Sequence, residues 1–288
     1  MTTIVGILNV TPDSFSDGGR FTDVEAAVAR GVELTRAGAA IVDVGGESTR
    51  PGAVRVDPAI ERERALPVVR GLAEHGVNVS IDTMNAATAL AAIDAGAVIV
   101  NDVSGGLADP DMLAAVAPTP AAIVLQHWRG HSDRMYERAE YRDVAREVAV
   151  ELQERVDAAA KAGISPDRLV LDPGIGFGKT PEQSWSLLHG LARIVALGPR
   201  VLVGTSRKGL LRGPLGIASP VADPAPDAAD EAASDDDASF ARRDLATAVT
   251  SVLAAQAGAW AVRVHDVAAT RDALAVRRAW LEGDPWYR

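Results

Sequence analysis

The sequence predicts a single (β/α)8 barrel. Three observations support this fold: short apolar runs alternate with longer alanine-rich segments of helical period, eight such runs can be counted, and the chain has 288 residues. Repeated β-α units indicate a parallel sheet, and barrels of about 250 residues commonly form one domain. An open, doubly wound sheet can be built from the same units, but the number of strands and the length favour one barrel domain over residues 1–288.

Eight runs rich in valine and isoleucine form the predicted strands. They are apolar throughout and do not alternate with polar residues, so we expect both faces of the sheet to be buried. In chain order the runs are 4–10, 40–44, 77–81, 97–100, 121–125, 168–171, 200–203 and 260–264.

Segments of helical period fill the gaps between the runs. The main examples are 23–37, 58–74, 85–95, 144–162, 181–197 and 243–257. A glycine follows each of six helical segments, at the position where helices end in a left-handed residue that favours glycine. These residues are Gly38, Gly76, Gly96, Gly163, Gly198 and Gly258.

Composition excludes several classes of protein. The net charge is −10, but seven acidic residues and no basic ones lie in 214–239, which is rich in proline and alanine. We predict a flexible insertion here, in the loop after the seventh strand. The chain has no cluster of basic residues for nucleic acid and no cysteine for disulfides or a thiol nucleophile. It has no apolar run of membrane-spanning length, so we expect a cytoplasmic protein.

Polar side chains follow every predicted strand. Barrel enzymes build their sites from the carboxyl-terminal ends of the strands, and eight polar ends in succession are more than turns and helix caps require. In chain order these ends are Asn9; Asp43 with 47–50; Asp82; Asn101 with Asp102; His127; Asp172; 206–208; and Arg263 with His265.

The residue types at these ends suggest a ligand. Asp82, Asn101 and Asp172 offer acceptors and an amide to a flat heterocycle with several N–H groups, while arginine and histidine side chains are suited to phosphate. Lys208 directly after a strand indicates a donor or a Schiff-base residue.

Other signals carry less weight. The run 174–180 has Pro173 where a phosphate-binding loop needs its first glycine, so we interpret Lys179 as an ordinary loop lysine. His75, His131 and His189 lack metal-ligand spacing and are interpreted as surface or loop residues. We expect His127 to have a structural role and not to act as a general base.

Ordered motifs then identify a family. The run 8–19, LNVTPDSFSDGG, closely resembles the opening signature of the dihydropteroate synthases, which are pterin-binding enzymes. Similar blocks follow in the family's order at 47–52, 81–83, 101–105, 172–178, 206–208 and 263–265. The resemblance covers the chain except the acidic insertion and the last few residues, and several long blocks in order are far more specific than one motif.

This resemblance implies a reaction in folate biosynthesis. The amine of 4-aminobenzoate displaces diphosphate from (7,8-dihydropterin-6-yl)methyl diphosphate and gives 7,8-dihydropteroate, without a covalent enzyme intermediate. We hypothesise an SN1-like path, because the pterin can delocalise charge on the methylene and the Asp82 carboxylate favours that charge. The family also implies Mg²⁺, a homodimer formed through the later helices, and competition of sulfonamides with 4-aminobenzoate.

The resemblance assigns roles residue by residue. Asn9 is the implied Mg²⁺ ligand, with Asp17 organising that site. The implied contacts of the diphosphate are Thr49, Arg50, Arg263 and His265; those of the pterin are Asp82, Asn101, Asp172 and Lys208; and those of 4-aminobenzoate are Phe15, Arg50, Pro51, Phe177 and Ser206.

One departure and two alternatives qualify this interpretation. Gln126 stands where the family often has a methionine against the pterin, so one pocket contact is in doubt. The first alternative is a catalytically silent pterin-binding paralogue, against which the intact motifs argue. The second is a methyltetrahydrofolate-dependent methyltransferase domain, which does not need the residues implied for diphosphate.

Overall fold

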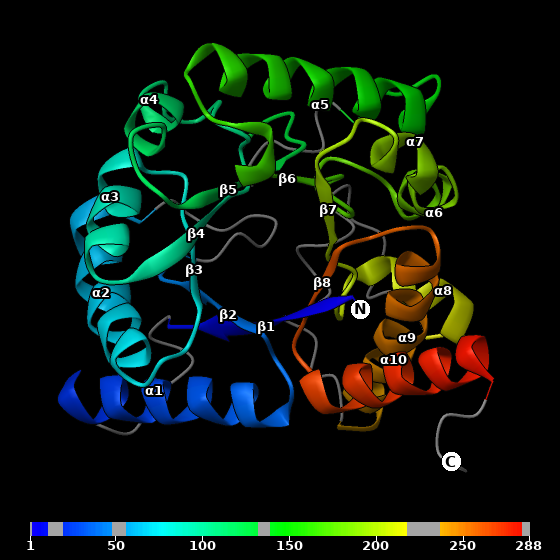
Figure 1. The fold of residues 1–288 in the computed structure, drawn as a ribbon. Coiled ribbons are helices and arrows are strands. Elements are labelled where there is room, and N and C mark those ends of the chain that lie inside the picture. The colour runs from blue at the N-terminus through cyan, green and yellow to red at the C-terminus, as the bar shows by residue number, and fades with distance from the viewer. Residues whose placement is uncertain (1, 11–19, 48–55, 132–138, 218–236, 284–288) are drawn as a thin grey trace.

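The eight strands lie at the centre of the molecule, and the helices surround them (Figure 1). The computed structural model describes residues 2–10, 20–47, 56–131, 139–217 and 237–283. In this part of the chain the strands are parallel and close into a barrel in sequence order, which confirms the predicted fold. The strands are β1 (Thr3–Asn9), β2 (Ile41–Gly45), β3 (Val79–Asp82), β4 (Ala97–Asp102), β5 (Ala122–Gln126), β6 (Leu169–Asp172), β7 (Arg200–Val203) and β8 (Ala261–Val264).

Side chains along each strand alternate between two apolar layers. Residues such as Val42 and Val44 belong to the main core between strands and helices, whereas Ile41 belongs to a separate cluster inside the barrel. That inner cluster consists of Val5, Ile41, Ile99, Val124, Val170, Leu202 and Ala261. Apolar runs are therefore buried on both faces, as expected for a closed parallel sheet.

The helices agree closely with the expected segments. They are α1 (Arg20–Ala37), α2 (Pro58–Glu74), α3 (Ala86–Asp94), α4 (Met112–Val116), α5 (Val144–Lys161), α6 (Pro181–His189), α7 (Leu191–Val195), α8 (Arg212–Leu215), α9 (Asp237–Gln256) and α10 (Val267–Glu282). Two short 3-10 helices, η3 (Pro166–Arg168) and η4 (Gly209–Leu211), lie in the connections before β6 and after β7. The six glycines expected to end helices all have positive φ, between 73° and 121°.

The segment 181–197 is two helices and not the single helix expected. It is interrupted at Gly190, where a Cβ atom would lie 2.5 Å from the Cβ of Ala145 at the start of α5. Residue 190 must therefore lack a side chain for α5 to approach this closely, and glycine disfavours a continuous helix.

The acidic insertion is shorter at both ends than the predicted 214–239. Arg212–Leu215 forms α8, and α9 already begins at Asp237, while 218–236 lie outside the described residues. Within the described ranges, no helix is both long and apolar enough to cross a membrane.

Candidate active site

A polar layer lies above the apolar cluster inside the barrel. Each of its residues comes two positions after a residue of the inner cluster, or after Ser80 on β3, and therefore faces the barrel interior as well. The layer contains Asp43, Asp82, Asn101, Gln126, Asp172 and Arg263; all are buried except Arg263, which is half-buried. These residues come from six strands, so closure of the barrel alone brings them together.

Register places the neighbours side by side. Asn9 pairs with Gly45, Gly45 pairs with Asp82, and Asp82 pairs with Asn101. A Cβ at Gly45 would lie 3.7 Å from both Asn9 Oδ1 and Asp82 Cβ. A side chain at position 45 would therefore contact both Asn9 and Asp82, and glycine keeps such atoms out from between them.

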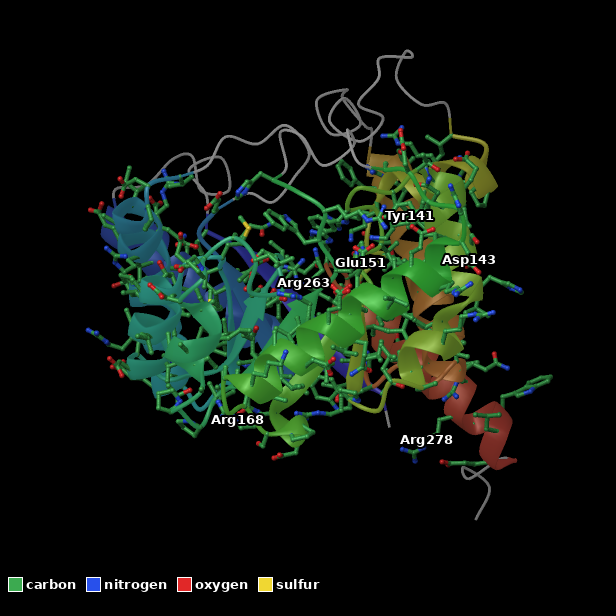
Figure 2. All side chains as sticks on the ribbon, turned by 90° about the horizontal axis from the view of Figure 1, so that it is seen from above. Tyr141, Asp143, Glu151, Arg168, Arg263 and Arg278 are labelled. Atoms are coloured by element: carbon green, nitrogen blue, oxygen red, sulfur yellow. The ribbon has the colours of Figure 1, made fainter. Side chains whose placement is uncertain are left out.

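Arg263, which is labelled in Figure 2, binds two carboxylates from other strands of the barrel. Its Nε donates to Asp43 Oδ2 at 2.6 Å, and its Nη2 donates to Asp82 Oδ2 at 2.9 Å. Burial raises the pKa of Asp82 to about 8; Arg263 opposes this rise, and the nearby Asp43 carboxylate adds to it. Nη1 of Arg263 has no hydrogen-bond partner among the residues the structure describes, so this one guanidinium nitrogen is available to a ligand.

Asn101 completes the cluster around Asp43. Its Nδ2 donates to Asp43 Oδ2 at 3.0 Å, while Asn101 Oδ1 and Asp43 Oδ1 are buried without partners in the described part of the chain. A small cavity adjoins these side chains and Arg263. Unsatisfied buried acceptors destabilise a fold, and their presence here indicates a functional site more than a core built for stability.

The loop from β6 to α6 brings further groups to the same end of the barrel. Asp172 Oδ1 accepts a hydrogen bond from Gly174 N at 2.7 Å, and burial raises the pKa of this carboxyl, opposed by Lys208. Lys208 Nζ donates to the Ile175 carbonyl and lies 4.6 Å from the centre of the Phe177 ring. A carboxylate, an amine and an aromatic ring therefore lie on one loop and its neighbour.

Ser206 and Lys208 are separated by a residue in an unusual conformation. Arg207 has a φ of 60°, the only positive φ outside glycine in the described ranges. Its guanidinium binds Asp244 of α9 through two hydrogen bonds of 2.7 Å, and its carbonyl accepts from Arg243 Nη1 at 2.9 Å. Contacts with α9 thus hold a backbone conformation that costs about 1 kcal/mol or more.

Ser206 and His265 are hydrogen-bonded to each other. The His265 backbone N–H donates to Ser206 Oγ at 3.1 Å, and Ser206 Oγ and His265 Nδ1 are hydrogen-bonded at 2.8 Å. The sequence assigned these residues to different substrates, 4-aminobenzoate and diphosphate, yet the structure makes them one unit at the ends of β7 and β8.

The remaining site residues named from the sequence cannot be placed. Phe15, Asp17, Thr49, Arg50 and Pro51 lie outside the described residues.

Sequence reasoning missed two features of the site. Asp43 was noted at a strand end without a role, although it is the closest partner of Arg263. Lys179, interpreted as an ordinary loop lysine, does lie in a loop, but its side chain is buried. Local pattern could recognise neither, because Arg263 is remote from Asp43 in sequence and the burial of Lys179 depends on His127, which is remote as well. By contrast His75 and His189 are exposed and His131 half-buried, as expected.

Fold and site together define an enzyme of the (β/α)8 class. Acceptors, an amide and a lysine at the barrel mouth suit a flat polar heterocycle, while Arg263 and His265 suit an attached anion. Residues 5–265 match the model of the pterin binding enzymes. The chain belongs to this family.

Curated relatives and solved structures agree with that assignment. The chain is 51% identical over 283 residues to the dihydropteroate synthase of Mycobacterium leprae (strain TN), covering 98% of this chain and 94% of that protein. It is 41% identical over 274 residues to the Streptococcus pyogenes dihydropteroate synthase, covering 95% and 93%. A structure of the Xanthomonas albilineans dihydropteroate synthase with 4-aminobenzoic acid has a TM-score of 0.83 at 42% identity, covering 99% and 94% of the two chains.

Proposed function

We propose that this protein is a dihydropteroate synthase. It condenses (7,8-dihydropterin-6-yl)methyl diphosphate with 4-aminobenzoate and releases 7,8-dihydropteroate and diphosphate. The observation that carries the proposal is the convergence of Asp82, Asn101, Asp172, Lys208 and Arg263 at one end of the barrel. Similarity to dihydropteroate synthases over nearly the whole chain supports the same reaction.

The pterin ring is held by groups with opposite hydrogen-bonding character. One carboxylate oxygen of Asp82 accepts a hydrogen bond from Arg263, and one carboxylate oxygen of Asp172 accepts from Gly174 N. Their other oxygens accept from the ring's N–H groups, and Lys208 donates to an acceptor on the ring. A flat heterocycle that presents donors and acceptors on adjacent edges satisfies this arrangement.

The diphosphate is bound at the rim of the same pocket. Arg263 offers Nη1, and His265, Thr49 and Arg50 are assigned here by the family motif. As diphosphate departs, negative charge develops on its oxygens, and preorganised cationic donors stabilise that charge.

Asn9 fits a role in holding magnesium. Mg²⁺ usually takes only one or two protein oxygens and completes its shell with water and substrate phosphates. The Asn9 Oδ1 lies 3.7 Å from the position that a Cβ would take at Gly45, as does the Cβ of Asp82, and Asp17 is the second residue assigned to this site. When bound, Mg²⁺ neutralises charge on the diphosphate.

The 4-aminobenzoate is assigned to the outer part of the pocket. The residues that the family motifs assign to it are Phe15, Arg50, Pro51, Phe177 and Ser206, and of these Phe177 and Ser206 lie in the described part of the chain. Sulfonamides should compete with this substrate, and competition with the pterin diphosphate would contradict the placement.

The chemical step depends on charge at the methylene carbon. Departure of diphosphate leaves this carbon electron-poor, and the ionised carboxylate of Asp82 stabilises it, so we infer an SN1-like path. A rate that does not change with the basicity of substituted anilines supports this path. A strong dependence in the chemical step would exclude it.

A coupled diphosphate-release assay tests the function. Release only when both substrates are present identifies the synthase. Binding of the pterin substrate without turnover identifies the silent paralogue instead, and failure to bind it rejects both.

Two further proposals concern the assembly and its location. Leu245, Val249 and Leu253 are exposed at four-residue intervals along α9, and Val276 and Trp280 are exposed on the neighbouring α10. Figure 1 shows these helices side by side. Exposed apolar residues at such intervals form a face suited to a protein partner, so we propose a homodimer through α9 and α10, measurable by light scattering. A cytoplasmic location stays a prediction.

A further inference from the structure

Lys179 is a buried ionisable side chain to which the proposed reaction assigns no substrate contact. It ends the loop from β6 to α6, directly before Thr180, the residue that caps α6. Only 1% of Lys179 is exposed. Burying an amine is costly unless its N–H groups find partners, so the contacts of Lys179 reveal what the burial achieves.

The amine of Lys179 binds three acceptors. Its Nζ donates to the Gly174 carbonyl at 2.9 Å, to the Phe177 carbonyl at 3.0 Å and to His127 Nδ1 at 2.9 Å. Burial lowers the pKa of Lys179 to about 7, while Asp172 opposes that shift. Either protonation state retains at least two N–H groups, which is enough for the two loop carbonyls.

His127 supports this lysine from the end of β5. Because Nδ1 accepts from Lys179, the ring proton is on Nε2, which donates to Glu151 Oε2 of α5 at 3.0 Å. Burial and the charge of Lys179 lower the pKa of His127 to about 4, so the ring is neutral. Arg129 also binds Glu151, and its guanidinium lies 3.8 Å from the centre of the Tyr141 ring. Figure 2 shows Tyr141 and Glu151 on the same side of the molecule.

The loop that Lys179 binds is rich in glycine, and Ile175 is its residue buried in the apolar core. Gly174, Gly176 and Gly178 all have positive φ and no side chains to pack. Lys208 binds the carbonyl of Ile175, between the two carbonyls bound by Lys179. Two lysines therefore hold consecutive parts of one glycine-rich loop, which also carries Asp172 and Phe177.

We propose that Lys179, supported by His127, is a positioning residue that holds the β6–α6 loop in the shape that presents Asp172, Phe177 and Lys208 to the substrates. The identity of the substrates in this role rests on the proposed function, whereas the effect of Lys179 on the shape of the loop is independent of it. Lys179 touches the loop backbone and not the reacting atoms, so its loss should weaken substrate binding more than it slows the chemical step.

The test compares Lys179→Met with Lys161→Met in the full-length protein. The substitution at position 179 keeps the length and apolar stem but removes the donor, while Lys161 is exposed at the end of α5. We expect amide hydrogen exchange in peptide 173–178 to become at least about tenfold faster in Lys179→Met, as expected for a segment released from its hydrogen bonds. Exchange in β1 to β4 should not change, and Lys161→Met should match the wild type throughout.

Kinetics give the second measurement. In Lys179→Met we expect KM for the pterin diphosphate to rise about tenfold, because the β6–α6 loop is no longer held in the shape that binds this substrate. The value of kcat should change less than about threefold. If Lys179→Met does not fold, Lys179→Gln keeps an N–H donor and should give a smaller change in the same direction.

Several outcomes would overturn the proposal. Unchanged exchange in 173–178 would reject it, and so would a folded variant with an unchanged KM. A uniform increase of amide exchange across the barrel would show that Lys179 stabilises the whole fold and has no specific role in the β6–α6 loop. If the wild type releases no diphosphate, the proposed function fails, but the exchange measurement still decides the role of Lys179 in the loop.

Discussion

Replacing Arg263 by methionine should destabilise the protein more at high pH than at low pH. The substitution removes both ion pairs, to Asp43 at 2.6 Å and to Asp82 at 2.9 Å, and keeps most of the apolar stem. It leaves two buried carboxyl groups without their cation. Removing one partner of a buried ion pair costs about 3–5 kcal/mol, and we expect a value in this range above pH 8.

The pH dependence follows from the pKa of Asp82. That pKa is raised in the folded protein from 3.8 to about 8, so the folded state holds a proton that the unfolded state releases. The protonated form is stable at low pH, and this contribution is lost as the pH rises through the folded pKa. Arg263 lowers the pKa of Asp82, so in the absence of Arg263 the ionisation of Asp82 in the folded protein costs still more free energy. The destabilisation should therefore be smaller at pH 6 than at pH 9.

Urea unfolding at pH 6 and pH 9 measures the effect. The control is Arg278→Met, because Arg278 forms an exposed ion pair with Glu282 that should contribute less than about 1 kcal/mol. Arg263→Met combined with Asp82→Asn should recover part of the loss at pH 9, since one stranded carboxyl is gone. A loss below about 1 kcal/mol at both pH values, or one that does not vary with pH, would refute the reasoning.

Three other changes test the site. The ionised form of Asp82 stabilises the methylene carbon, so kcat/KM for the pterin diphosphate should rise with pH through about 8. Asp82→Asn should abolish this rise and most of the activity. The same pH profile in wild type and variant would contradict the role of Asp82. Gln126 is buried and donates to the Val103 carbonyl at 3.4 Å. Gln126→Met should alter pterin affinity, measured by calorimetry, without abolishing turnover. Identical affinities in wild type and variant would contradict a contact between Gln126 and the pterin. Deleting the acidic insertion should change kcat little. The deletion should be limited to 218–236, because the Leu215 carbonyl accepts from Arg242 and α9 begins at Asp237. A folded variant with a large loss of rate would contradict this prediction.

Local pattern was sufficient for much of the fold. The expected helix at 58–74 matches α2 at both ends, and the expected strand at 200–203 matches β7. Pro58 follows Asp57, which caps the helix by accepting from Ala59 N, and such signals lie within a few residues of each other. The break at Gly190 was missed because it depends on the approach of Ala145 from another helix.

The sequence by itself determined the barrel, its strand ends and the family, because periodicity, helix caps and ordered motifs are local properties of the chain. Only the tertiary structure decided how those ends combine. It paired Arg263 with Asp43 and Asp82, joined Ser206 to His265, and buried Lys179 against His127 and two loop carbonyls. The contacts of Arg263, Ser206 and His127 join residues remote in sequence and form only when the barrel closes. They lie out of water, where burial raises the pKa of Asp82 and lowers that of Lys179.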